Sequence, residues 1–169
     1  MNAIVIQPEQ PVILDDLTIL PFTVAHDPIK PAVGYRIDYR GRSVVISGDT
    51  ITTDRLLTAA KDVDVVIHDA LGKEAHSLVL QGAEQAGRNR IYKIVSDVLD
   101  YHADSLKLEA AIEQTGARQL VLYHLVPVPA NPLMERAFAR GLSGKTILAE
   151  DFMRISLPVN SDQIDIRWP

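Results

Sequence analysis

Short apolar runs, separated by turn-forming residues, recur along the chain and predict a sheet with helices around it. The hairpin between residues 34–39 and 43–46 is the clearest case, because Gly41 of Arg40-Gly41-Arg42 can supply a positive φ. Two continuous apolar runs, 63–67 and 120–123, are typical of strands buried on both faces. The other expected strands are residues 12–14, 17–24, 146–149, 152–157 and 164–168.

Helices are expected between these strands at points where capping residues begin or end a polar-apolar pattern. Thr53-Asp54 offers an N-cap, Gly87 and Gly116 are C-cap residues, and Pro132 suits a first helical turn. The expected helices are residues 54–60, 75–86, 90–99, 105–115 and 132–140. This order predicts an α/β domain with a mixed sheet, and the absence of a repeat or low-complexity linker predicts one domain over residues 1–169.

Composition narrows the possible partners. The formal net charge is −5, and no basic run suggests a surface that grips a phosphate backbone, so a nucleic-acid partner is not favoured. No apolar run reaches the roughly 20 residues of a membrane span. Residues 1–12 lack the pattern of a secretory signal, which favours the cytoplasm, although a targeting segment upstream would remove that inference. Without cysteine, any transition metal must be held by His and carboxylate.

Chemistry-bearing residues follow three expected strands. Asp49, the His68-Asp69 pair and His124 each come after an apolar run. Because ligands collect at the carboxyl ends of strands in layered α/β proteins, these residues predict a shared site. Imidazole and carboxylate suit zinc, manganese or iron, and Asp49 could bridge two cations. A water bound to such a metal has a pKa near about 7 and can hydrolyse a substrate at neutral pH.

Structural interpretations of the same residues remain open. Asp49 could be a turn residue or a helix cap, and His124 could be a core histidine satisfied by the backbone. His68 fits a structural role beside a metal ligand better than direct ligation, because Asp69 can hold it or be held by it.

The other three histidines differ in their surroundings. His102 could merely precede a helix, and His76 is expected to be a solvated side chain inside a polar helix start. His26 follows a strand and precedes Pro28, so its stiff loop could equally present the imidazole to a site or serve only as a connection.

At these residues the sequence resembles the metallo-β-lactamase superfamily, and within it the ribonuclease Z and arylsulfatase-like hydrolases. The stretches that carry the likeness run in the family's order from Thr23 to Leu157: VAHDPIKPAVGYRIDYRGRSVVISGDT, DVDVVIHDA, DYHAD, LVLYHLVP and ILAEDFMRISLP. The resemblance implies the C-terminal half of a four-layer αββα sandwich, in which a mixed sheet is flanked by helices.

The resemblance also implies roles. Asp49 would bridge two zinc ions, His124 would be the last histidine ligand of one of them, and His102 would donate a proton to the leaving group. His68-Asp69-Ala70 is similar to the family's His-Glu-Ala, whose acidic residue orients the proton donor. Asp69 is one methylene shorter than that glutamate.

The family's His-x-His-x-Asp-His motif is missing from the chain, as is any pair of histidines separated by one residue. Asp49 and His124 cannot complete two zinc shells by themselves, so only partial zinc binding or none is expected. Without a second αβ half, an apolar sheet face and a strand edge should be exposed, which predicts self-association or pairing with a complementing N-terminal half.

Two main interpretations follow. The first is a truncated metal-dependent hydrolase, inactive alone, whose parent cleaves an ester, phosphodiester or lactone of a small molecule with metal-bound hydroxide. The second is a metal-independent module that dimerises or binds a partner through the same half-fold. A third, tRNA processing, follows only from the resemblance to ribonuclease Z and is disfavoured by the acidic balance.

Overall fold

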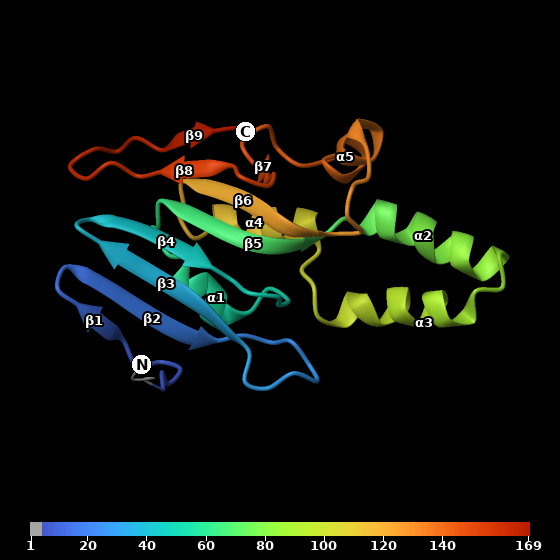
Figure 1. Cartoon of the computed structure of the whole chain (residues 1–169), viewed down its shortest axis with the longest axis horizontal. Helices are drawn as coiled ribbons and strands as arrows, with labels where there is room; N and C mark the ends of the chain where they lie inside the picture. Colours follow the sequence, from blue (N-terminus) through green and yellow to red (C-terminus); the bar gives the residue numbers. More distant parts are fainter. Residues whose placement is uncertain (1–4) are drawn as a thin grey trace.

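The computed structural model describes residues 5–169 and has a seven-stranded sheet in the strand order β1-β2-β3-β4-β5-β6-β7 (Figure 1). The strands of this sheet are β1 (Val12–Leu14), β2 (Leu17–Thr23), β3 (Val33–Tyr39), β4 (Arg42–Ile46), β5 (Val65–Leu71), β6 (Gln119–Val126) and β7 (Ile147–Leu148). The helices are α1 (Asp54–Ala59), α2 (Lys73–Gln85), α3 (Asn89–Asp97), the 3₁₀ turn η1 (Val98–Asp100), α4 (Ser105–Glu113) and α5 (Pro132–Phe138). A separate hairpin consists of β8 (Arg154–Ser156) and β9 (Asp165–Arg167).

Strand direction divides the sheet into two parts. Strands β1 to β4 pair antiparallel, whereas β4, β5, β6 and β7 pair parallel. Parallel neighbours need a crossover connection. Helix α1 lies in the crossover from β4 to β5, and α2, α3, η1 and α4 lie in the crossover from β5 to β6. The expected α/β architecture, a mixed sheet with flanking helices, is confirmed.

The expected β3–β4 hairpin is present, but its turn has two residues rather than three, because Arg42 already belongs to β4 and pairs with Tyr39. Arg40 and Gly41 both have positive φ, 46° and 76°, which is the backbone of a type I′ turn. Glycine takes this conformation without steric cost, and a matching right-handed twist on both sides sets the register Tyr39↔Arg42.

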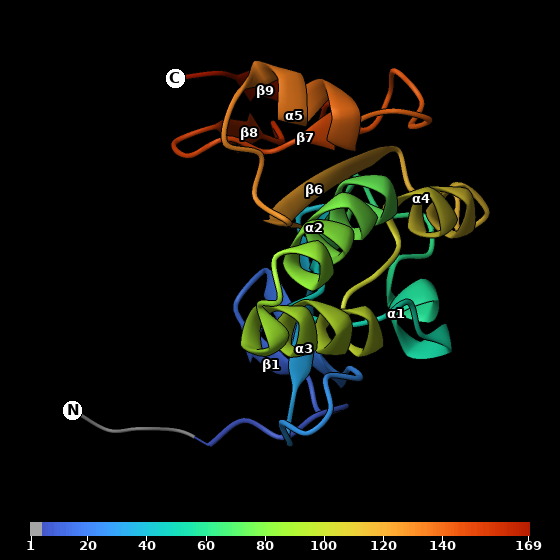
Figure 2. The ribbon, with the colours of Figure 1, turned by 90° about the vertical axis from the view of Figure 1, so that its right-hand side faces the viewer.

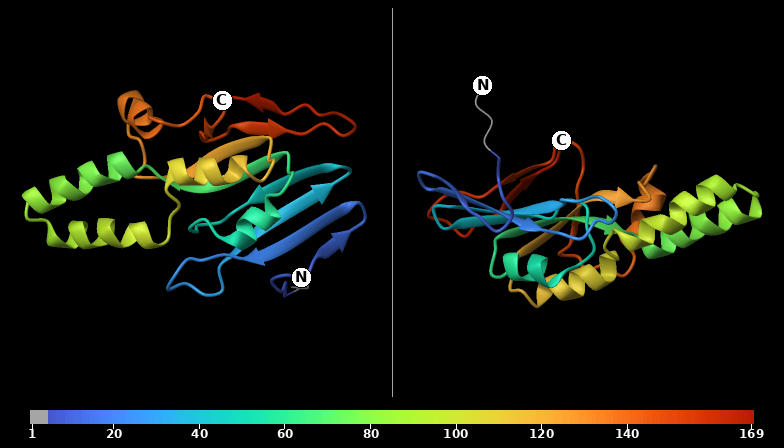
Figure 3. Two further views of the ribbon diagram at one scale, coloured as in Figure 1. Left: turned by 180° about the vertical axis from the view of Figure 1, so that it is seen from behind. Right: turned by 90° about the horizontal axis from the view of Figure 1, so that it is seen from below.

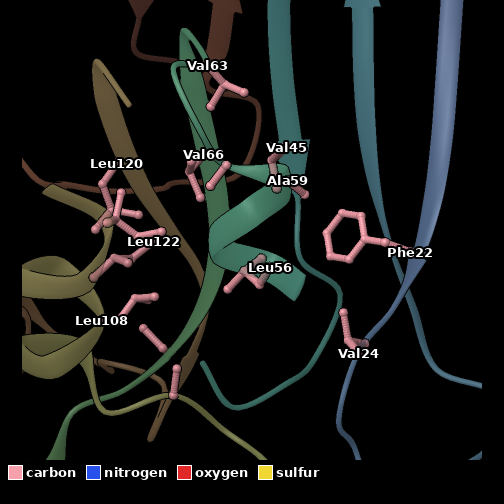
Figure 4. Packing of buried hydrophobic residues seen from close by; sticks show 14 of the residues in the cluster. Phe22, Val24, Val45, Leu56, Ala59, Val63, Val66, Leu108, Leu120 and Leu122 are labelled. Atoms are coloured by element: carbon pink, nitrogen blue, oxygen red, sulfur yellow. The ribbon is translucent and has the colours of Figure 1, made fainter. Parts of the chain in front are cut away.

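The core lies between one face of the sheet and the helices α1 and α4, which Figure 3 shows on the same side. Val45, Val66 and Leu122 of three neighbouring strands pack in one cluster with Leu56 of α1 and Leu108 of α4 (Figure 4). Both helices begin at capping side chains that accept backbone N–H groups: Thr53 before α1 and Asp104 before α4.

The opposite face of the sheet carries a row of apolar side chains that are only half-buried. Ile37 pairs with Ile19 on one side and with Val44 on the other, so the three side chains lie together. They alternate with residues of the core cluster such as Val45, and therefore point to the face away from α1.

Helices α2 and α3 form an antiparallel pair that projects from the end of the sheet, as Figures 1 and 2 show. His76 of α2 lies between them, 3% exposed, with Nε2 2.6 Å from the carbonyl oxygen of Val95 in α3. The prediction of a solvated His76 is wrong, because α3 folds back onto the helix face that carries this residue.

A buried ion cluster ties the C-terminal tail to the sheet. Asp64 accepts from Arg42 at 3.0 Å and from Arg118 at 2.7 Å. Arg42 also donates to the carbonyl oxygens of Ser161 and Gln163, in the loop between β8 and β9. In residues 5–169, none of the helices has the length and apolar character needed to cross a membrane.

Candidate functional site

The candidate residues lie at the carboxyl ends of three neighbouring parallel strands. Asp49 follows β4, Asp69 lies two residues before the end of strand β5, and His124 lies two residues before the end of strand β6. Strands β5 and β6 are longer than predicted, so the His68-Asp69 pair and His124 lie inside strands rather than after them. The expectation that these residues share one edge of the sheet agrees with this arrangement.

His124 occupies a β-bulge. Asp69 pairs with Tyr123 and Ala70 with Leu125, so His124 is the extra residue of β6, and its φ is +43°. A non-glycine residue rarely takes this conformation, and such strain is concentrated at functional sites. The bulge brings Nδ1 of His124 to 2.7 Å from Oδ1 of Asp49, and both side chains stay partly exposed.

His102 and Asp69 form a buried pair. Nδ1 of His102 lies 2.6 Å from Oδ2 of Asp69, with side-chain exposures of 6% and 0%. Ala103 accepts the backbone N–H of Leu71 at 2.7 Å, which holds the segment of His102 against β5. The shorter carboxylate of Asp69 therefore reaches the imidazole, although the family resemblance places glutamate there.

The second oxygen of Asp69 has its own partners. Oδ1 accepts the backbone N–H of Thr50 at 3.1 Å and lies 3.0 Å from Nδ1 of His68. Burial raises the pKa of Asp69, but the hydrogen bonds and charges of His102 and His68 outweigh it, so the net pKa lies below its ordinary value. Asp69 is thereby held ionised, and each of its carboxylate oxygens accepts a hydrogen bond.

Four aromatic rings cluster at this pair, and His102 is one of them. The ring of His26 lies 4.9 Å from that of Tyr101, Tyr101 lies 5.0 Å from His102, and His102 lies 5.1 Å from His124. His26 thus stands at the site, with its ring 6.1 Å from that of His102. His68 is different, since it is fully buried and its Nε2 has no hydrogen-bond partner within the described chain.

The family was identified by comparison with known proteins. The pattern described as "Beta-lactamase superfamily domain" matches residues 1–125. The chain belongs to this superfamily.

Curated relatives are named ribonuclease Z. The protein of Mycobacterium tuberculosis (strain H37Rv) is 31% identical over 146 residues, which are 85% of this chain and 50% of that protein. The protein of Mycobacterium avium (strain 104) is 29% identical over 87% of this chain and 50% of its own length. The chain spans about half the length of these relatives.

Solved structures confirm the fold of this beta-lactamase superfamily chain. The metallo-β-lactamase fold protein YhfI of Bacillus subtilis superposes with a TM-score of 0.59 and 21% identity, over 87% of this chain and 52% of its own. Human tRNase Z, short form, gives 0.54 and 21%, over 88% and 46%. Zinc-bound PqqB of Methylobacterium extorquens gives 0.52 and 15%, over 86% and 49%.

The described residues supply too few ligands for a zinc ion. Among residues 5–169, no three His, Asp or Glu side chains stand close enough together to hold a metal. Asp49 and His124 are donors of the right type, but a zinc shell takes at least three protein ligands. Two ligands about 2.1 Å from one tetrahedral zinc would lie about 3.4 Å apart. The observed 2.7 Å is a direct hydrogen bond, so these two residues alone do not make a zinc site.

Sequence reasoning missed three residues next to the predicted ones. Thr50 donates to Asp69 and accepts the backbone N–H of Ala25 on its Oγ1 at 3.0 Å, which ties the site to the loop of His26. The ring of Tyr101 packs against the rings of both His26 and His102. Burial, followed by the charges of Asp49 and Asp69, raises the pKa of Tyr123. Each directly adjoins a predicted site residue, which was the available signal.

Proposed function

We propose that this chain, a single domain over residues 1–169, carries the proton-donor pair and part of the metal site of a metal-dependent hydrolase. The observation that supports the proposal is a chain of three side-chain contacts. Asp69 contacts His102, the ring of His102 packs against that of His124, and His124 contacts Asp49. Membership of the beta-lactamase superfamily adds support, because the family resemblance implies these roles for these residues.

His102 is the proton donor in this proposal. Ionised Asp69 can only accept, so Nδ1 of His102 carries a hydrogen toward it, and Nε2 is the atom left to gain and release a second proton. A buried carboxylate that stays charged also stabilises the doubly protonated ring. His102 would deliver its proton to a leaving-group oxygen, and Asp69 and His68 act by positioning the donor.

The remaining metal ligands come, in this proposal, from polypeptide other than residues 1–169. This part of the proposal is supported by the comparison with the relatives, since the chain matches only about half of the length of each one. The half-buried apolar row of Ile19, Ile37 and Val44 also supports it, because a second αβ half would cover that face. Zinc is the metal that such imidazole and carboxylate donors suit.

The substrate is an ester, a phosphodiester or a lactone in this proposal. The name of the relatives, ribonuclease Z, brings RNA into the candidate set beside small molecules. The net charge of −5 and the partly exposed acidic Asp49 weigh toward a small substrate, since long-range attraction of RNA needs basic surface.

A chimera tests the hydrolase proposal. This chain would replace the matching region of the M. tuberculosis ribonuclease Z, and zinc content and hydrolysis of bis(p-nitrophenyl) phosphate would be measured. We expect zinc binding and turnover, with His102→Asn retaining the zinc and losing about 100-fold or more in rate, as for removal of a general acid. A zinc-loaded chimera in which His102→Asn hydrolyses at the unchanged rate would refute the role of His102.

The second interpretation is a metal-independent module that pairs through its open sheet face, favoured by the incomplete ligand set. Size-exclusion chromatography with metal analysis of the isolated chain separates the two. A metal-free dimer whose association is lost in Ile37→Lys supports the module. A zinc-free chain whose association is unaffected by Ile37→Lys supports the hydrolase part, whose remaining ligands lie on other polypeptide.

A further inference from the structure

The α2–α3 pair carries a partly exposed apolar stripe. Ile91 and Ile94 of α3 and Val98, the first residue of η1, follow the spacing i, i+3, i+7 and form this stripe. Ile91 is 39% exposed and Ile94 is 54% exposed, and no residue of α3 is fully buried. The pair projects beyond the sheet (Figure 1), and Figure 2 looks along it toward the sheet.

The charges beside the stripe are arranged by sign. Arg90 and Asp97 are seven residues apart, so they lie on the same flank of α3, one near each end. Both side chains are exposed, and neither takes part in an ion pair within residues 5–169. The flank is therefore basic near the helix start and acidic near its end.

We infer that this stripe is the contact surface for a second copy of the chain, with the two α3 helices antiparallel across a two-fold axis. In this arrangement Ile91 of one copy packs against Ile94 of the other, as apolar layers do in antiparallel helix pairs. Arg90 of each copy then lies beside Asp97 of the other, and the helix dipoles oppose each other. A two-fold contact must be self-complementary. The charge pattern meets this condition, because Arg90 and Asp97 have opposite signs and exchange places between the two copies.

Other partners fit the same surface less well. An anionic membrane or a nucleic acid would be attracted by Arg90 but repelled by Asp97 on the same flank. A parallel pair of copies would place Arg90 against Arg90 and Asp97 against Asp97. Helix α3 has only nine residues, so the contact is small and the dimer should be reversible.

A cysteine cross-link tests the contact, because the chain has no cysteine of its own. Ile94→Cys lies next to the proposed axis, whereas Leu133→Cys in α5, where Leu133 is 76% exposed, is a matched control away from it. Under mild oxidation at about 50 µM protein we expect Ile94→Cys to form a disulfide dimer at least about tenfold faster than Leu133→Cys. Equal rates would overturn the inference.

Charge reversal supplies a second, reversible test by sedimentation velocity. Arg90→Glu and Asp97→Arg should each shift the dimer toward monomer, because each creates like-charge contacts across the axis. The double variant carries both reversals, restores opposite charges and should recover the dimer. A chain that stays monomeric at all concentrations, or a double variant no better than either single one, would contradict the inference. A dimer unaffected by all three variants would place the contact elsewhere, on the sheet face for example.

Discussion

Nδ1 of His102 lies 2.6 Å from Oδ2 of Asp69 although 33 positions separate the two residues along the chain. The whole α2–α3 pair is inserted between them and projects outward, while both ends of the insertion return to the same point of the sheet. The isolated bridge between Leu71 and Asp104 closes this excursion and holds the two residues in register.

The buried carboxylate of Asp69 should be essential to the stability of the chain. Asp69→Ala leaves His102 and the Thr50 N–H without their carboxylate acceptor, although Nδ1 of His68 keeps the backbone carbonyl oxygen of residue 69 at 2.7 Å. The expected loss in free energy of unfolding is about 3–5 kcal/mol. Urea denaturation measures it. Asp165→Ala in β9, where the side chain is exposed, is the control and should change stability by less than about 0.5 kcal/mol. Equal effects would show that the Asp69 contacts are not made.

Asp69 should also make stability depend on pH in acid. Its pKa in the folded protein is lowered, so its contribution is complete above the unfolded pKa of about 3.9 and is lost as pH falls through the folded pKa. The stability difference between wild type and Asp69→Asn should therefore shrink between about pH 5 and about pH 3. Denaturant midpoints at the two pH values measure it, and a difference that grows on acidification would contradict the lowered pKa.

The backbone of His124 should prefer glycine to alanine. At φ +43° an L side chain costs about 1–2 kcal/mol that glycine avoids, so His124→Gly should be more stable than His124→Ala by about 1 kcal/mol. In Thr18, an ordinary strand position of β2, the order should reverse, because glycine weakens a regular strand. Urea unfolding of the four variants is the measurement, and the same order at both positions would argue against the bulge.

Two glycines should respond to alanine in opposite directions. A Cβ on Gly34 would lie 2.6 Å from the ring of Phe22 and 2.8 Å from the carbonyl oxygen of Ser47, so Gly34→Ala should cost about 1–3 kcal/mol. Gly82, inside α2, meets no atom within 4 Å, so Gly82→Ala should stabilise the chain by up to about 1 kcal/mol. Thermal unfolding compares them, and stabilisation by Gly34→Ala would contradict the close packing of β3 against β2.

The sequence was most informative where local physics decides the structure. The Arg40-Gly41 turn, the cap at Thr53 and Pro132 at the start of α5 all agree with the structure, because each depends on neighbouring residues alone. Buried parallel strands were found as continuous apolar runs, but β5 and β6 continue through polar residues. Their ends are set by pairing with each other, which no local pattern records.

The candidate site was less completely predictable. His76 was misjudged because its burial depends on the return of α3, a contact between distant segments. The positive φ of His124 has no sequence signature, because the conformation is uncommon for any residue other than glycine and no local pattern marks it. The metal-binding roles of Asp49 and His124, and the proton-donor role of His102, remain predictions that rest on their proximity and on family resemblance.

The measurement that tests the central account most directly is the zinc content of the chimera in which this chain replaces the matching region of the M. tuberculosis ribonuclease Z. The account predicts that the chimera binds zinc, that Asp49→Asn and His124→Ala each lower the zinc content, and that the exposed control Asp165→Asn does not. A chimera that holds the same amount of zinc in Asp49→Asn and His124→Ala as in the unchanged chain would contradict a metal-binding role for this edge of the sheet.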